Sequence, residues 1–107
     1  MGFFKFSERD EGSIQQEIVE KLAGLGYDCL CLELTGGRGW PDLVVFKRSK
    51  NGEKTRPLFL EIKDPRGKVS PHQWKVSEFL FSHGQTWYYT DSVAEAIEIV
   101  EREFRTQ

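Results

Sequence analysis

The sequence lacks long hydrophobic runs and has few cysteines and histidines. No apolar run in the 107 residues approaches the roughly 18 that a membrane-spanning helix needs, and the N-terminus does not read as a signal peptide. Cys29 and Cys31 lie too close along one expected strand for a disulfide, and the two distant histidines complete no zinc site with them. We therefore expect reduced thiols, no membrane contact and a cytoplasmic location.

An excess of positive charge is also missing. The chain has 15 Lys and Arg against 17 Asp and Glu, a formal net charge of −2, which argues against a generally basic nucleic-acid binder. A local basic patch stays compatible with this balance, because cations gather in one part of the sequence: Arg38, Lys63, Arg66 and Lys68. Acidic residues concentrate near the C-terminus: Glu95, Glu98, Glu101 and Glu103.

The length allows one domain, and 38% hydrophobic with 30% charged residues is the composition of an ordinary soluble globule. Residues 1–12 have no clear hydrophobic period despite three phenylalanines, so we expect an N-terminal arm followed by one domain over residues 13–107.

Hydrophobic periodicity predicts three helices. The first is capped by Gly12 or Ser13 and is ended by Gly24 and Gly26. The second begins after Ser70 and reaches His83, and the third is capped by Asp91 or Ser92. Their expected apolar stripes are Ile14, Ile18, Leu22 and Leu25; Val76, Phe79, Leu80 and His83; and Val93, Ile97, Val100 and Phe104. Ser70 with Gln73, and Ser92 with Glu95, have capping-box spacing.

Four segments read as strands. The first runs over residues 27–34, the next two flank a polar turn that contains Asn51-Gly52 and form a hairpin, and the last covers residues 85–90. The second helix then crosses over to set the last strand parallel to the strand of Glu61. The resulting fold class is α/β, a mixed four-stranded sheet flanked by helices in the order αβββαβα.

Three charged residues converge at one end of the expected hairpin. Alternation along a strand puts Glu61 and Lys63 on the same face, and an antiparallel partner can bring Asp42 to the same end. Two carboxylates that both stay ionised favour a divalent cation between them, and a nearby lysine can orient a water nucleophile. On spacing alone, a surface salt bridge explains the triplet as well.

The segment before Pro41-Asp42 is rich in glycine. Gly36, Gly37 and Gly39 indicate a close backbone approach, and the amides of this loop with Arg38 could contact a phosphate. A plain glycine turn with a solvated arginine is the alternative.

Together these motifs resemble the PD-(D/E)xK nuclease signature. The order of the following residues is similar to that of the VRR-NUC family, the virus-type replication-repair nuclease domains: Glu17, Gly36-Gly37, Gly39, Pro41-Asp42, Glu61-Ile62-Lys63, Gly67, Ser70 and Gln73. The resemblance covers roughly residues 13–89, and its individual motifs are weak while their combined order and spacing are fairly specific.

The resemblance implies a metal-dependent DNA endonuclease, in which Asp42, Glu61, the Ile62 carbonyl and Glu17 bind Mg²⁺ or Mn²⁺. It implies that Lys63 positions the nucleophilic water and gives Gln73 a place in the active site, beside contacts to DNA from Arg38, Arg66 and Lys68. Small members of the family resemble Holliday-junction resolvases, which implies branched DNA as substrate, a role in DNA repair, a bacterial or phage-infected cell as the setting, and a homodimer.

Several alternatives stay open. Glu17 can form an exposed i,i+4 pair with Lys21, and Gln73 can serve the helix cap, the site or both. Trp74 and Phe81 are expected off the core face of the second helix, either as a dimer contact or, for Trp74, beneath the N-terminal arm. The whole chain could instead be a nuclease-like binding module, or a restriction-type enzyme, although no separate recognition domain is evident.

Overall fold

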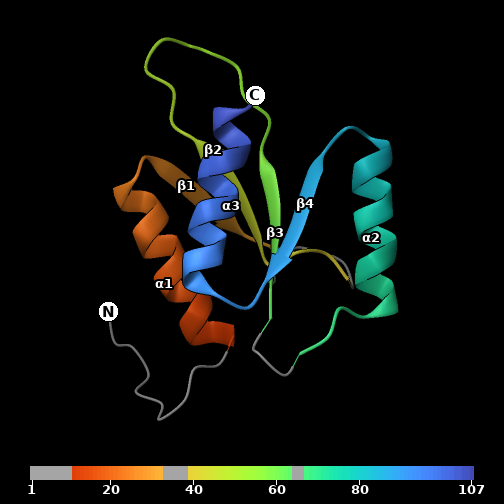
Figure 1. Cartoon of the computed structure of the whole chain (residues 1–107). Helices are drawn as coiled ribbons and strands as arrows, with labels where there is room; N and C mark the ends of the chain where they lie inside the picture. Colours follow the sequence, from red (N-terminus) through yellow and green to blue (C-terminus); the bar gives the residue numbers. More distant parts are fainter. Residues whose placement is uncertain (1–10, 33–38, 64–66) are drawn as a thin grey trace.

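The computed structural model describes residues 11–32, 39–63 and 67–107 (Figure 1). The elements follow the predicted αβββαβα order. Helices are α1 (Glu11–Gly24), α2 (Pro71–Ser82) and α3 (Val93–Arg105), and strands are β1 (Tyr27–Cys31), β2 (Leu43–Lys47), β3 (Leu58–Ile62) and β4 (Thr86–Thr90). No helix in these ranges is long and apolar enough to cross a membrane.

The four strands form one mixed sheet in the order β1-β2-β3-β4. Strands β1 and β2 are antiparallel, as are β2 and β3, and the crossover through α2 returns β4 parallel to β3. The predicted hairpin and the predicted parallel last strand are therefore both confirmed. The β2–β3 register pairs Leu43 with Leu60. This pairing fixes which residues just before β2 lie opposite the last residues of β3.

The main hydrophobic core lies between one face of the sheet and helices α1 and α3. Buried β3 residues Leu58, Leu60 and Ile62 pack there with Ile18 of α1 and Val100 of α3. Figure 1 shows α1 and α3 together against the sheet, while α2 lies beside β4. Because β3 side chains alternate, Phe59 and Glu61 lie on the opposite face, toward α2. That second face is where the charged residues gather.

Two predicted details of α1 are wrong. The helix begins at Glu11, so Gly12 and Ser13 lie in its first turn rather than capping it. Leu25 follows the end of the helix and is exposed, because the backbone turns at Gly26, whose φ is 102°. The apolar stripe of α1 is therefore Ile14, Ile18 and Leu22.

The stripe predicted for α2 is also wrong. Of its four members only Leu80 is buried, while Phe79 and His83 are exposed with their rings 4.3 Å apart between centroids. Trp74 and Phe81 do lie off the core face, as expected, with 46% and 82% of their surface exposed, and the Trp74 ring contacts that of Trp87 on β4 at 5.5 Å between centroids. The physical reason is that α2 covers only part of the sheet, so aromatic residues along β4 decide which side of the helix is covered.

The stripe of α3 lies one step around the helix from the predicted one. Ala96, Ile99, Val100 and Phe104 are buried, whereas Val93 and Ile97 are partly buried at its margin. Ser92 is the N-cap, as expected, but the Glu95 carboxylate accepts a hydrogen bond from the Thr90 hydroxyl at 2.5 Å rather than completing a capping box. Strand β1 ends at Cys31, earlier than predicted.

Candidate active site

The β2–β3 register brings Asp42 and Glu61 together. Since Leu43 pairs with Leu60, the preceding Asp42 lies opposite Glu61 at the same end of the antiparallel pair. The Asp42 carboxylate accepts a hydrogen bond from the backbone N–H of Ile62 at 2.8 Å. The Asp42 carbonyl accepts another from the Leu32 N–H at 2.8 Å, beyond the end of β1. Asp42 is thus tied to both neighbouring segments of the sheet.

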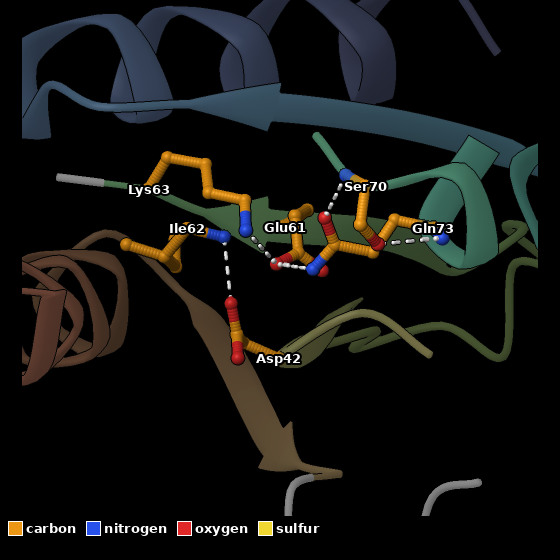
Figure 2. A network of polar contacts seen from close by, with 6 residues as sticks. All are labelled: Asp42, Glu61, Ile62, Lys63, Ser70 and Gln73. Atoms are coloured by element: carbon orange, nitrogen blue, oxygen red, sulfur yellow. Dashed lines mark hydrogen bonds and ion pairs between the residues drawn. The ribbon is translucent and has the colours of Figure 1, made fainter. Parts of the chain in front are cut away.

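Glu61 is the most buried charged residue of the site, with 2% of its surface exposed. Its Oε2 accepts a hydrogen bond from Gln73 Nε2 at 2.8 Å and lies 3.6 Å from Lys63 Nζ. The Lys63 side chain is itself only 14% exposed, so the ion pair is weakly screened by solvent. Figure 2 shows the three side chains converging from β3, its end and the first turn of α2. The prediction that Glu61 and Lys63 share a face is confirmed.

Gln73 occupies its place for two reasons at once. Ser70 caps α2, with its hydroxyl accepting from the Gln73 N–H at 3.2 Å, while Gln73 Oε1 accepts from the Ser70 N–H at 2.8 Å. This capping box uses the oxygen of the amide and leaves Nε2 to donate to Glu61 (Figure 2). One side chain therefore completes the helix cap and also contacts the Glu61 carboxylate, while a role of Gln73 in catalysis stays a prediction.

Gly39 sets how closely the strand entry approaches α2. Its φ is 87°, and a Cβ placed there would lie 2.8 Å from the backbone carbonyl carbon and oxygen of His72. Only glycine fits such an approach without displacing the backbone. The close approach expected from this segment is confirmed at Gly39, whereas Gly36 and Gly37 lie outside the described residues.

The remaining predicted site residues are Glu17, Lys68, Arg38 and Arg66. Glu17, on α1, lies with its carboxylate 3.8 Å from Lys21 Nζ, the pair that the sequence offered as the alternative. Over residues 11–32, 39–63 and 67–107, no three His, Cys, Asp or Glu residues form a group that could hold a metal ion. The metal role of Glu17 stays a prediction. Lys68 is exposed shortly before α2, and Arg38 and Arg66 fall outside the described residues.

The donor set of this site fits a hard divalent cation. Asp42 and Glu61 offer carboxylate oxygens at one end of adjacent strands, and the Ile62 backbone between Glu61 and Lys63 belongs to the same strand end. Mg²⁺ and Mn²⁺ prefer oxygen ligands and need only one or two protein carboxylates besides water and phosphate. The nearby Lys63 offsets part of the negative charge of the pair.

Sequence reasoning missed the aromatic residues next to the site. Tyr89 pairs with Glu61 in the parallel β3–β4 register, so both side chains lie on the α2 face of the sheet. Trp74 follows Gln73 directly and meets the Tyr89 ring nearly at right angles, at 83°, with 5.9 Å between centroids. The sequence predicted that the two strands are parallel. It did not predict which residue of β4 lies beside Glu61, because that depends on the β3–β4 register of the folded sheet.

Taken together, the element order and the placement of Asp42, Glu61 and Lys63 define a nuclease-fold domain of the PD-(D/E)xK type. No family model matches the sequence, and no curated protein does. Solved structures do. A "VRR_NUC domain" is similar with a TM-score of 0.68 and 28% identity, over 85% of this chain and 94% of that one.

A second solved structure, a "VRR_NUC domain protein", has a TM-score of 0.69 and covers 94% of this chain and 92% of its own. At 15% identity it speaks for the fold alone. The VRR-NUC resemblance indicated by the order of the sequence motifs is thereby confirmed.

Proposed function

We propose that this protein is a Mg²⁺- or Mn²⁺-dependent DNA endonuclease that hydrolyses phosphodiester bonds. The observation that carries the proposal is the buried Glu61 carboxylate, held by Gln73 and Lys63 and aligned with Asp42 across the β2–β3 pair. A buried charged residue costs free energy unless partners or a bound ion compensate it. An arrangement built around such a residue, in a VRR_NUC-like fold, is better explained by chemistry than by stability.

Each side chain has a role in the proposed reaction. Asp42 and Glu61, with the Ile62 carbonyl and Glu17, would hold the metal ion, which supplies Lewis acidity toward the phosphate when bound. Lys63 holds its ammonium beside Glu61, where it can orient the attacking water and offset charge that develops on the phosphate. Gln73 fixes the Glu61 carboxylate through its amide N–H. Lys68, Arg38 and Arg66 are proposed to contact the DNA backbone.

Cleavage of labelled DNA tests this function directly. A four-way junction, a flap and a linear duplex are each incubated with Mg²⁺, with Mn²⁺ and with EDTA. We expect metal-dependent strand cleavage by the wild type, and a loss of roughly 10²-fold or more in Asp42→Ala and in Glu61→Ala. If the wild type binds DNA without cleaving it, and both variants bind equally well, the protein is a nuclease-fold binding module rather than an enzyme.

The proposed substrate is branched DNA such as a four-way junction, and the proposed active form is a homodimer. One chain carries one set of Asp42, Glu61 and Lys63, whereas resolving a junction requires two incisions related by symmetry. Support for a contact surface comes from Phe81 on α2, which is 82% exposed beside a groove of about 750 Å³ along β4. Burying this ring would contribute roughly 1.5–3 kcal/mol.

Light scattering at micromolar concentration tests the dimer. We expect twice the mass of the 12.4 kDa chain, and a monomer for Phe81→Glu that still binds metal but makes only single nicks in a junction. Leu30→Glu is the matched control, because Leu30 is also exposed but lies on β1 at the other edge of the sheet. A monomeric wild type defeats the dimer.

A further inference from the structure

Two half-exposed aromatic rings lie directly beside the candidate active site. Tyr89 and Trp74 are 49% and 46% exposed, and Trp87 completes the group at 5.7 Å from Tyr89 between ring centroids. Adjacent exposed aromatic rings that form one patch often mark a site for a ligand or partner. Because each ring contacts the other two, their positions are fixed before any ligand arrives.

Tyr89 lies on β4, the strand that pairs with the strand of Glu61. It is the register partner of Glu61, and neighbouring strands lie about 4.8 Å apart. The next residue, Thr90, accepts a hydrogen bond at its carbonyl from the Lys63 N–H at 2.9 Å. Lys63 and Tyr89 also line a common hollow of about 380 Å³, which lies in the size range of small-ligand sites.

The charges that line this hollow are mixed. It extends from Lys63 to residues of α3, and it is lined by two cations, Lys63 and Arg102, and by three carboxylates, Asp91, Glu95 and Glu98. Carboxylates repel a phosphate but do not repel a neutral base. A nucleotide whose phosphate sits near Lys63 can therefore place its neutral base beside Tyr89 without repulsion from these carboxylates.

We propose that Tyr89, braced by Trp74, is a stacking platform for one unpaired nucleobase of DNA next to the phosphate that is cleaved. This proposal rests on the proposed nuclease function and adds a reason for preferring branched DNA: bases at a branch point are released from the helical stack at less cost than bases inside a duplex. Stacking tolerates all four bases, so the platform reads DNA structure rather than sequence.

A fluorescent base tests the platform without relying on activity. A DNA fork carries 2-aminopurine at the nucleotide adjacent to the branch, and Ca²⁺ replaces Mg²⁺. We expect wild-type binding to change the fluorescence of this base but not that of 2-aminopurine placed inside the duplex arm. Tyr89→Ala should abolish the change and weaken binding roughly five- to a hundredfold, as expected for one lost base–aromatic stack. Tyr89→Phe should retain both.

Controls separate stacking from folding. Phe46→Ala removes an aromatic ring that is 44% exposed, similar to Tyr89, but that lies on β2, two strands away from β4, and it should leave the signal unchanged. On a fork that is abasic at the probed position, wild type and Tyr89→Ala should bind equally. The same loss for Tyr89→Ala on the abasic fork would show a merely structural role and overturn the platform.

The outcomes also distinguish this inference from the nuclease itself. A fluorescence change without cleavage in either Mg²⁺ or Mn²⁺ refutes the enzyme and keeps the platform as part of a binding module. Cleavage with an unchanged 2-aminopurine signal refutes the platform and keeps the enzyme. No binding of any DNA overturns both.

Discussion

At the scale of single residues, Gln73 shows how one side chain can serve folding and chemistry together. Its amide oxygen caps α2 and its amide nitrogen holds Glu61. The Ser70–Gln73 spacing was readable as a capping box, because that motif depends on local sequence alone. The contact with Glu61 was not readable from spacing, because it depends on where α2 starts relative to β3.

We expect Gln73→Ala to lower the free energy of unfolding by roughly 1 kcal/mol and also to lower activity, since both contacts are lost. Ser70→Ala is the matched variant: it removes the hydroxyl of the cap and leaves the Gln73 amide able to reach Glu61. It should cost about the same stability with a much smaller effect on cleavage. Urea unfolding and single-turnover cleavage measure the two effects. If both variants lose the same activity, the helix cap explains the loss and the contact of Gln73 with Glu61 contributes nothing to cleavage.

Gly39 makes a second residue-scale prediction. In Gly39→Ala the new Cβ would meet backbone atoms of His72 at 2.8 Å, and the positive φ would be strained. Since neither side of this contact is a flexible side chain, we expect a loss of roughly 1–3 kcal/mol. Gly52→Ala is the control, because it shares a positive φ of 73° but has no neighbour within 4 Å of the added Cβ. The melting temperature of Gly39→Ala should fall further than that of Gly52→Ala, because only the first variant has the contact with His72. Equal melting temperatures would contradict this prediction.

At the scale of elements, the sheet was predictable and the packing of helices was only partly so. Strands β2 and β3 were identified by apolar runs around a polar turn, and the parallel β4 by the crossover helix, because these features are local or follow a strong topological rule. The stripes of α2 and α3 were misplaced because periodicity does not reveal which neighbour covers a helix. Trp74 packs on β4 for that reason, despite lying off the expected stripe.

Strand β1 carries a pH-dependent contribution to stability. Burial, together with a 2.6 Å hydrogen bond to Glu101, raises the pKa of Tyr27 from 10.0 to about 12. Burial, with the nearby Cys31 and Asp28, raises the pKa of Cys29 from 9.0 to about 11. Both groups are neutral in the folded state and ionise more readily when unfolded. Their stabilising contribution is complete below about pH 9 and is lost as the pH rises toward the folded values.

We therefore expect the free energy of unfolding, measured by urea titration, to fall between pH 9 and pH 11 more steeply in the wild type than in Tyr27→Phe/Cys29→Ala. The comparison removes the contributions of other titrating groups that the two proteins share. Parallel curves for wild type and double variant would contradict the effect.

At the scale of the whole molecule, metal binding should couple to folding. Asp42 and Glu61 lie opposite each other in the sheet, and a cation that binds only the folded chain stabilises it by mass action. We expect saturating Mg²⁺, at one hundred times its dissociation constant, to add about 2.7 kcal/mol. Differential scanning fluorimetry with Mg²⁺ or EDTA measures the shift, and Asp42→Ala should abolish it. An unchanged midpoint in the wild type would argue against a metal site.

The two faces of the sheet should respond differently to substitution. The face toward α1 and α3 holds the continuous core of Ile18, Leu60 and Val100, while the face toward α2 holds Glu61 and Tyr89. In a saturation mutagenesis library scored for cellular abundance and for DNA cleavage, first-face substitutions should lower both scores together. Second-face substitutions at exposed positions such as Tyr89 should lower cleavage while abundance persists. Neighbouring residues of one strand would thus alternate between two phenotypes, with the two-residue period of the strand itself.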